Sequence, residues 1–176
     1  MSPAGGSSHP MAPLIRFTLI GLYLALVLPL PWQASAALGP LLWGAVAVGL
    51  VLVVALTSER VEIDARGIRV GHPAWCAWWL RRGWQISWPA VTAITPVSTS
   101  QGGRVYYLRS GDGAFLLPQR VARFEAFLAG VAAHSDLDTS GIGRISPPWT
   151  YRLLAVLSAL MLTGELIWGL TLLAGS

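Results

Sequence analysis

Three long apolar runs constrain this sequence more than any other feature, and they occupy residues 14–28, 36–56 and 153–173. Each run approaches the roughly 20 apolar residues that a helix needs to cross the hydrocarbon core of a bilayer. Charged residues make up only 11% of the chain, against about 25% in typical soluble domains. The sequence therefore predicts a transmembrane hairpin of two spans at residues 13–57 and a third span at residues 148–174.

The water-facing part of the chain lies between the second and third runs, in residues 58–147. This stretch holds ten of the twelve arginines and seven of the eight acids. Arg16 flanks the start of the first span, whereas the loop between the first two spans carries no charge. Because arginine-rich segments stay on the cytoplasmic side, we expect the N-terminus and the middle domain in the cytoplasm. The expected membrane is an inner, plasma or thylakoid-type membrane.

The N-terminal region admits a second interpretation. Arg16, the apolar core that follows it and the sequence Ala34-Ser35-Ala36 also match a secretory signal with an A-x-A cleavage site. The second span would still deliver the middle domain to the same face, so cleavage leaves the expected orientation unchanged. Residues 1–12 are small and polar, and they are predicted to form a disordered tail.

Residues 58–135 consist of short strand patterns separated by turns. Gly67, which is free to adopt a positive φ, and the pair Gly102-Gly103 mark hairpin turns. After the last strand the period changes, and apolar residues at helical spacing predict an amphipathic helix over residues 118–134 that starts at a proline. Residues 136–147 are polar and are predicted to be a linker. The expected strands occupy residues 60–64, 68–70, 85–88, 91–94, 104–109 and 114–117.

Six short strands closed by one helix resemble the bacterial pleckstrin-homology-like (PH-like) domains that adjoin membrane spans. Residues 61–70 (VEIDARGIRV) resemble the first hairpin of that group, and the Ile-Ser-Trp at residues 86–88 with its following spaced aliphatics resembles a second segment. The first hairpin loop offers only Arg66 and Arg69, fewer than the Lys/Arg pairs of the inositol-phosphate-binding members. The resemblance implies a membrane α-helical protein of three spans with a small α+β PH-like barrel between spans two and three. It also implies a binding or scaffolding role.

One set of candidate functional residues combines positive charge with aromatic rings. Tryptophan favours membrane interfaces and arginine favours anionic headgroups, so this set predicts a surface for lipid or for a partner protein. The alternative is that the tryptophans fill the core of the domain and the arginines are solvated. The members of the set are Trp78, Trp79, Arg81, Arg82 and Trp84.

The second candidate is Glu165, an acid within the third span, about four helical turns beyond Tyr151. A carboxylate inside a membrane is costly and suggests a functional role by default. Three interpretations stay open: a hydrogen bond to a neighbouring helix, a contact with a partner protein or cofactor, and a proton relay. A relay needs further polar groups at membrane depth, and the other spans supply only Thr18 and Tyr23.

No motif in the sequence indicates an enzyme, a resident cofactor or a metal site. Cys76 is the single cysteine, and no G-x-S-x-G motif surrounds a serine. Nucleic-acid binders carry a denser basic patch than ten arginines offset by seven acids, so we expect no nucleic-acid partner.

We therefore expect a non-enzymatic scaffold or assembly factor with membrane lipids and a membrane-protein partner. Residues 146–165 loosely resemble small proteins of photosynthetic bacteria, which makes a photosynthetic membrane complex one expected client. The alternatives are a binding module for an anionic lipid surface and a transport component that uses Glu165.

Overall fold

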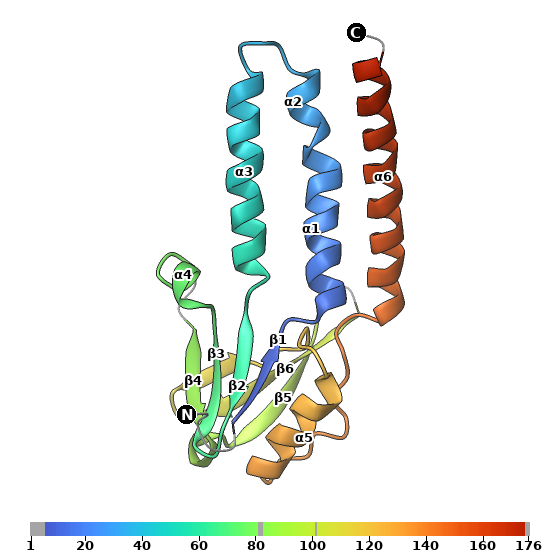
Figure 1. Ribbon diagram of the computed structural model, residues 1–176. Helices are drawn as coiled ribbons and strands as arrows, with labels where there is room; N and C mark the ends of the chain where they lie inside the picture. The colour runs from blue at the N-terminus through green and yellow to red at the C-terminus, as the bar shows by residue number, and fades with distance from the viewer. Residues whose placement is uncertain (1–5, 81–82, 101, 175–176) are drawn as a thin grey trace. The chain divides into compact units, whose positions relative to one another are not determined.

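The computed structural model describes residues 6–80, 83–100 and 102–174, with the backbone alone at residues 172 and 173 (Figure 1). The chain divides into two compact units that alternate along the sequence. The helical unit comprises Pro13–Thr57 and Pro148–Ser176, and the α+β unit comprises Met1–Ala12 and Ser58–Pro147. Three long apolar helices and two small antiparallel sheets give a mixed α+β fold.

The helical unit contains α1 (Pro13–Val27), α2 (Pro29–Gln33), α3 (Gly39–Leu56) and α6 (Pro148–Ala174). Two prolines at the start of α2 separate it from α1, because proline lacks the N–H that would continue the hydrogen-bond ladder. The prediction of three long apolar helices is confirmed. By length and composition, the segments that suffice to cross a membrane are Pro13–Gln33, Gly39–Leu56 and Pro148–Thr171.

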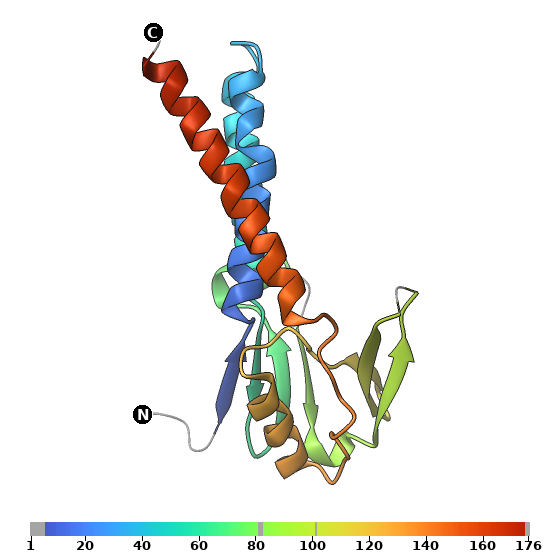
Figure 2. The ribbon, with the colours of Figure 1, turned by 90° about the vertical axis from the view of Figure 1, so that its right-hand side faces the viewer.

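Helix α1 lies between α3 and α6 and contacts both (Figure 1), and α6 crosses it obliquely (Figure 2). Two side chains of α1 donate hydrogen bonds to backbone carbonyls of its neighbours. The Tyr23 hydroxyl donates to Val46 on α3 at 2.8 Å, and the Thr18 hydroxyl donates to Tyr151 on α6 at 3.3 Å. Gly49 permits the first contact, because a Cβ at this position would overlap the Tyr23 ring.

The α+β unit is built on two antiparallel sheets with the strand orders β1-β2-β3-β4 and β5-β6-β7. Both orders are linear over the described residues, so neither sheet closes on itself. The elements of the unit are β1 (Ser7–Pro10), β2 (Arg60–Ile63), β3 (Gly67–Gly71), α4 (Ala74–Ala77), β4 (Trp84–Ser87), the 3₁₀ turn η1 (Trp88–Ala90), β5 (Ala93–Ser98), β6 (Arg104–Ser110), β7 (Gly113–Leu116) and α5 (Phe124–His134). All six strands expected from the sequence are present with shifted ends.

The core of the α+β unit is formed by inward-facing residues of both sheets and one face of α5. Strand β2 alternates between exposed and buried residues, as its sequence predicts. Trp88 belongs to this core: its indole N–H donates to the carbonyl oxygen of Asp64 at 2.8 Å, and its ring stacks on His134 with centroids 5.5 Å apart. The α5 side chains in the core are Phe124, Phe127, Leu128 and Val131.

The prediction of a disordered tail at residues 1–12 is wrong for the described part of that segment. Strand β1 pairs with β2 at the edge of the first sheet, with His9 opposite Val61. His9 is 3% exposed and lies edge-on to Phe127, with ring centroids 5.7 Å apart. One buried ring and pairing with β2 therefore order a segment whose composition resembles that of a disordered tail.

The helix predicted over residues 118–134 begins six residues later, at Phe124. In the preceding segment Val121 forms an isolated antiparallel bridge with Met11, just after the N-terminal strand, and residues 122–123 form a turn. The N–H of Ala122 donates to Pro10 at 2.7 Å, and the N–H of Ala12 donates to Arg120 at 2.8 Å. Arg123 then turns the chain into α5 through a left-handed conformation with φ 50°.

The linker predicted at residues 136–147 packs onto the α+β unit. Ile142 is 8% exposed and joins the core. The Tyr106 hydroxyl donates to the carbonyl oxygen of Gly141 at 2.7 Å, and the Gln119 side-chain amide donates to that of Gly143 at 2.6 Å. This segment is therefore packed against the core of the α+β unit, although its polar composition predicted a linker.

The buried position of His9 predicts a pH dependence of stability. Burial lowers the pKa of His9 from its ordinary 6.5, and the charge of Arg123 acts in the same direction, while the backbone of Ala122 opposes both. Below about pH 6.5 the His9 imidazole therefore binds a proton more readily in the unfolded chain than in the folded chain. The free energy of unfolding falls as the pH drops below that value. Thermal unfolding of the detergent-solubilised chain between about pH 8 and about pH 5 should show a falling Tm, with a weaker slope in His9→Leu.

The exposed His134 provides the matched control, and His134→Gln should keep the wild-type slope. Backbone N–H groups of Arg66 and Gly67 lower the pKa of Asp64 below its ordinary 3.8. Its contribution to stability is present above that value and is lost only at lower pH, outside the measured window. An unchanged slope in His9→Leu would contradict the assignment to His9.

Candidate functional site

The connection between β3 and β4 forms a compact loop at residues 73–80, here called the tryptophan loop. Its turn is set by Pro73, whose carbonyl oxygen accepts the N–H groups of Cys76 at 3.1 Å and Ala77 at 2.9 Å. The Cys76 thiol is fully buried and also points to that carbonyl, with the sulfur 3.5 Å from the oxygen. Cys76 is thus the buried member of a loop whose neighbouring tryptophans are exposed.

Three tryptophans of this loop are exposed: Trp75 by 50%, Trp78 by 82% and Trp79 by 39%. The Trp78 indole N–H donates to the carbonyl oxygen of Trp75 at 3.1 Å, and the Trp78 and Trp79 rings meet edge to face at 6.5 Å. Fully burying one large apolar side chain is worth about 1.5–3 kcal/mol, so three exposed rings forgo much of the driving force for folding. A clustered apolar patch of this kind is a candidate interaction surface.

The structure divides the predicted surface set. Trp78 and Trp79 are on the exposed loop, and Trp75, one helical turn before Trp78, joins them. Trp84 instead packs against the core, with its ring centroid 5.2 Å from that of Phe115. The prediction for Arg81 and Arg82 lies outside the described residues. Trp75 was not in the predicted set. Its spacing of three residues from Trp78 was the signal that could have placed it on the same face of a helical turn.

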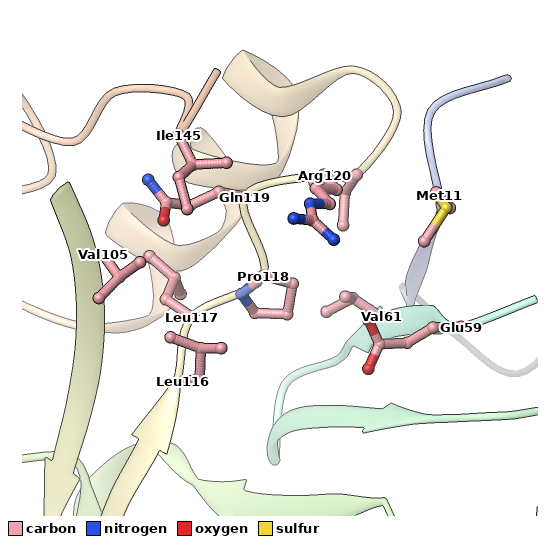
Figure 3. A pocket seen from close by; sticks show the side chains of 11 residues that line it. Met11, Glu59, Val61, Val105, Leu116, Leu117, Pro118, Gln119, Arg120 and Ile145 are labelled. Carbon is pink, nitrogen blue, oxygen red and sulfur yellow. The ribbon is translucent and has the colours of Figure 1, made fainter. Parts of the chain in front are cut away.

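A pocket of about 200 Å³ opens elsewhere in the α+β unit (Figure 3). Val61, Leu117 and Val121 give it apolar walls, and Figure 3 shows the charged side chains of Glu59 and Arg120 on different walls. The pocket mixes apolar surface with single charges of both signs. Among residues 6–80, 83–100 and 102–174, no group of three His, Cys, Asp or Glu side chains is placed to hold a metal ion.

Glu165 lies on α6 near a cluster of tryptophans from three helices. The ring of Trp32 is 5.7 Å from that of Trp43 and 6.5 Å from that of Trp168. Trp168 follows Glu165 by three residues, which is about 4.5 Å along a helix axis. Oε2 of Glu165 is shielded from solvent and has no hydrogen-bond partner among the described residues. The Glu165 carboxyl group therefore lies one helical turn from the aromatic cluster, and its Oε2 can still accept a hydrogen bond.

The fold and these sites define a class: a chain with three long apolar helices and an α+β unit that carries an exposed tryptophan loop. No family model matches the chain. It is 42% identical over 167 residues to the "Uncharacterized protein slr0269" of Synechocystis sp. (strain ATCC 27184 / PCC 6803 / Kazusa), an alignment that covers 91% of this chain and 81% of that protein. The chain belongs to the family of this cyanobacterial protein.

Glu165 yields a prediction that separates a helix contact from proton transfer. Glu165→Gln keeps the shape and the hydrogen-bonding capacity, so it should preserve association with other membrane proteins. A polar contact between helices is worth about 0.6–2 kcal/mol in a membrane, so if Glu165 makes one with a partner helix, Glu165→Leu should weaken that association. Co-purification in mild detergent, together with growth of the variant strains, measures both effects.

Thr163→Val is the matched control on the same helix, because the Thr163 hydroxyl donates to the carbonyl oxygen of Ala159 in its own helix at 2.8 Å. It should behave as the wild type does. If Glu165→Gln impairs growth as strongly as Glu165→Leu while the complex stays intact, the helix-contact interpretation fails and proton transfer replaces it.

Proposed function

We propose that the chain is an integral membrane protein with three spans. The apolar helices have sufficient length, and most of their large apolar side chains face outward, as a lipid environment requires. Trp149 and Trp168 on α6 are 168 − 149 = 19 residues apart, or about 28 Å at the helical rise. Tryptophans favour the two membrane interfaces, which are separated by about 30 Å of hydrocarbon, so this spacing supports the assignment.

The proposed function is a non-enzymatic binding module that engages a lipid surface through the tryptophan loop. The observation that carries this proposal is the exposure of Trp75, Trp78 and Trp79 on the same loop. An indole ring in the interfacial region keeps its N–H wet while its apolar surface leaves water. The order of six strands followed by α5 is that of the PH-like resemblance, and a PH-like identity of the unit is part of this proposal.

The lipid contact is tested with a fluorescent label at residue 78 of the full chain. The variant Trp78→Cys is labelled with a thiol-reactive nitrobenzoxadiazole dye and reconstituted into lipid nanodiscs. We expect blue-shifted emission and strong quenching by lipids that carry a spin label near the headgroup, because the label then resides in the interface. Cys76 is fully buried, so the unmodified chain should take up little dye.

Glu125→Cys, an exposed position on α5, is the matched control for the label. Its quenching should be weaker than that at residue 78. Equal or stronger quenching at residue 125, with emission at residue 78 typical of water, would show that the tryptophan loop does not contact lipid.

A scaffold or assembly role is the second candidate, and Glu165 is the observation that favours it. Its shielded Oε2 lacks a hydrogen-bond partner among the described residues, and a polar group on a partner helix would supply one. A membrane complex, including a photosynthetic one, would be the client. A defined protein that co-purifies with the wild type and is lost from Glu165→Leu would support this role.

The proposed orientation has the N-terminus and the α+β unit in the cytoplasm and the C-terminus outside. Its basis is the concentration of arginine in residues 58–147. A green fluorescent protein fused before Met1 should stay in the cytoplasm and fluoresce. The same reporter fused after Ser176 should be exported and should not fluoresce, whereas alkaline phosphatase fused after Ser176 should be active. The opposite set of reporter activities would overturn the orientation.

A further inference from the structure

A second pocket, of about 210 Å³, lies on the outer face of the β2–β3 hairpin, where β3 leads into the tryptophan loop. Its walls include Arg60 and Glu62 of β2 and Arg69 of β3, all on the solvent side of the sheet. In the strand register Arg60 faces Gly71 and Glu62 faces Arg69. The two arginines are therefore diagonal neighbours, about 7–8 Å apart at the backbone, and both flank the pocket.

Gly71 creates much of this space. It stands opposite Arg60 and contributes no side chain to the outer face. A Cβ built at Gly71 would meet only the Cα of Gly83, at 4.0 Å, so the position is open and has no steric need for glycine. A larger residue at Gly71 would fit the backbone and occupy the pocket.

Among the side chains that line the pocket, two guanidinium groups and one imidazole face a single carboxylate, that of Glu62. Neither Arg60 nor Arg69 forms an ion pair with any described residue, although Glu62 is the cross-strand neighbour of Arg69. His72 lines the same pocket, and its Nδ1 is shielded from solvent without a hydrogen-bond partner among the described residues. Two guanidinium groups and an imidazole N–H suit a phosphate group, whose oxygens accept charge-assisted hydrogen bonds from several sides.

The chain connections place this pocket close to the membrane that the proposed function requires. Arg60 follows the last residue of α3, Leu56, by four residues. An extended chain covers at most about 3.6 Å per residue, so Arg60 lies within about 14 Å of the end of that helix. The lining also includes Pro73, the first residue of the tryptophan loop.

We propose that this pocket binds the phosphate group of an anionic phospholipid headgroup while the tryptophan loop contacts the same lipid surface. This inference rests on the proposed function. Arg60 and Arg69 donate to the phosphate oxygens, and the His72 imidazole supplies a third donor. Glu62 lowers the net positive charge of the pocket, so the membrane contact of the tryptophan loop has to raise the local concentration of the phosphate.

The test uses the purified full chain in a non-ionic detergent. Binding of dihexanoyl phosphatidylglycerol, dihexanoyl phosphatidylcholine and inorganic phosphate is measured by calorimetric titration. We expect the phosphatidylglycerol to bind most tightly. Arg60→Gln and Arg69→Gln should each weaken it about tenfold, the effect of losing one charge-assisted hydrogen bond. Gly71→Val should weaken it at least as much without any change of charge.

Arg109→Gln is the matched control, since Arg109 is an exposed arginine of the other sheet. It should bind as the wild type does, and circular dichroism should show that all variants are folded. Phosphatidylglycerol binding that survives both arginine substitutions overturns the site. Inorganic phosphate that binds as tightly as the lipid overturns the lipid source.

The outcomes also distinguish this inference from the proposed function. Suppose that Arg60→Gln, Arg69→Gln and Gly71→Val bind phosphatidylglycerol as the wild type does, and that the label at residue 78 is quenched in nanodiscs. The pocket assignment then fails, and the membrane contact of the tryptophan loop stands. If the label at residue 78 reports water, the membrane contact itself fails.

Discussion

Backbone pairing of the N-terminal segment holds the α+β unit together as a discontinuous domain. The N–H of Met11 donates to the carbonyl oxygen of Glu59 at 3.2 Å, and the N–H of Ala12 donates to that of Arg120 at 2.8 Å. Residues 11 and 12 are thereby joined to Glu59, which precedes β2, and to Arg120, which precedes α5. Since three helices, α1, α2 and α3, separate β1 from β2 in the chain, β1 can pair with β2 only after residues 60–63 have been synthesised.

This arrangement explains which parts of the fold were predictable. The long helices follow from apolar composition, and β2, β3 and β6 follow from alternation, because both signals are carried within each segment. Strand β1 carries no such signal: Ser-Ser-His-Pro has a single side chain to bury, and its partners in β2 lie fifty or more residues away in the sequence. The late start of α5 has the same origin, since Val121 pairs with Met11 in an isolated bridge and its neighbours bond to Pro10 and Ala12.

The candidate site was predictable in composition but not in placement. A tryptophan suits a core as well as a membrane interface, so the sequence left both interpretations open for Trp78, Trp79 and Trp84. The structure separates them by their surroundings: Trp84 packs against the core beside Phe115, whereas the rings of Trp78 and Trp79 meet each other on an exposed loop. The pocket beside the loop was missed because it depends on the register that sets Gly71 opposite Arg60, and register is a property of the pair of strands.

The polar groups of the helical unit bear on the role of Glu165. A proton relay requires side chains that can accept and release protons in sequence, with bonding capacity free for the transfer. The hydroxyls of Thr18, Tyr23 and Ser158 each donate instead to a backbone carbonyl, at 3.3, 2.8 and 2.8 Å. These bonds fasten α1 to its neighbours or close on the helix itself. Glu165 also lies one turn from the cluster of Trp32, Trp43 and Trp168, where tryptophans would mark an interface. A carboxyl near the headgroups costs less than one at the midplane, and its shielded oxygen is better matched to a neighbouring helix than to a path across the membrane.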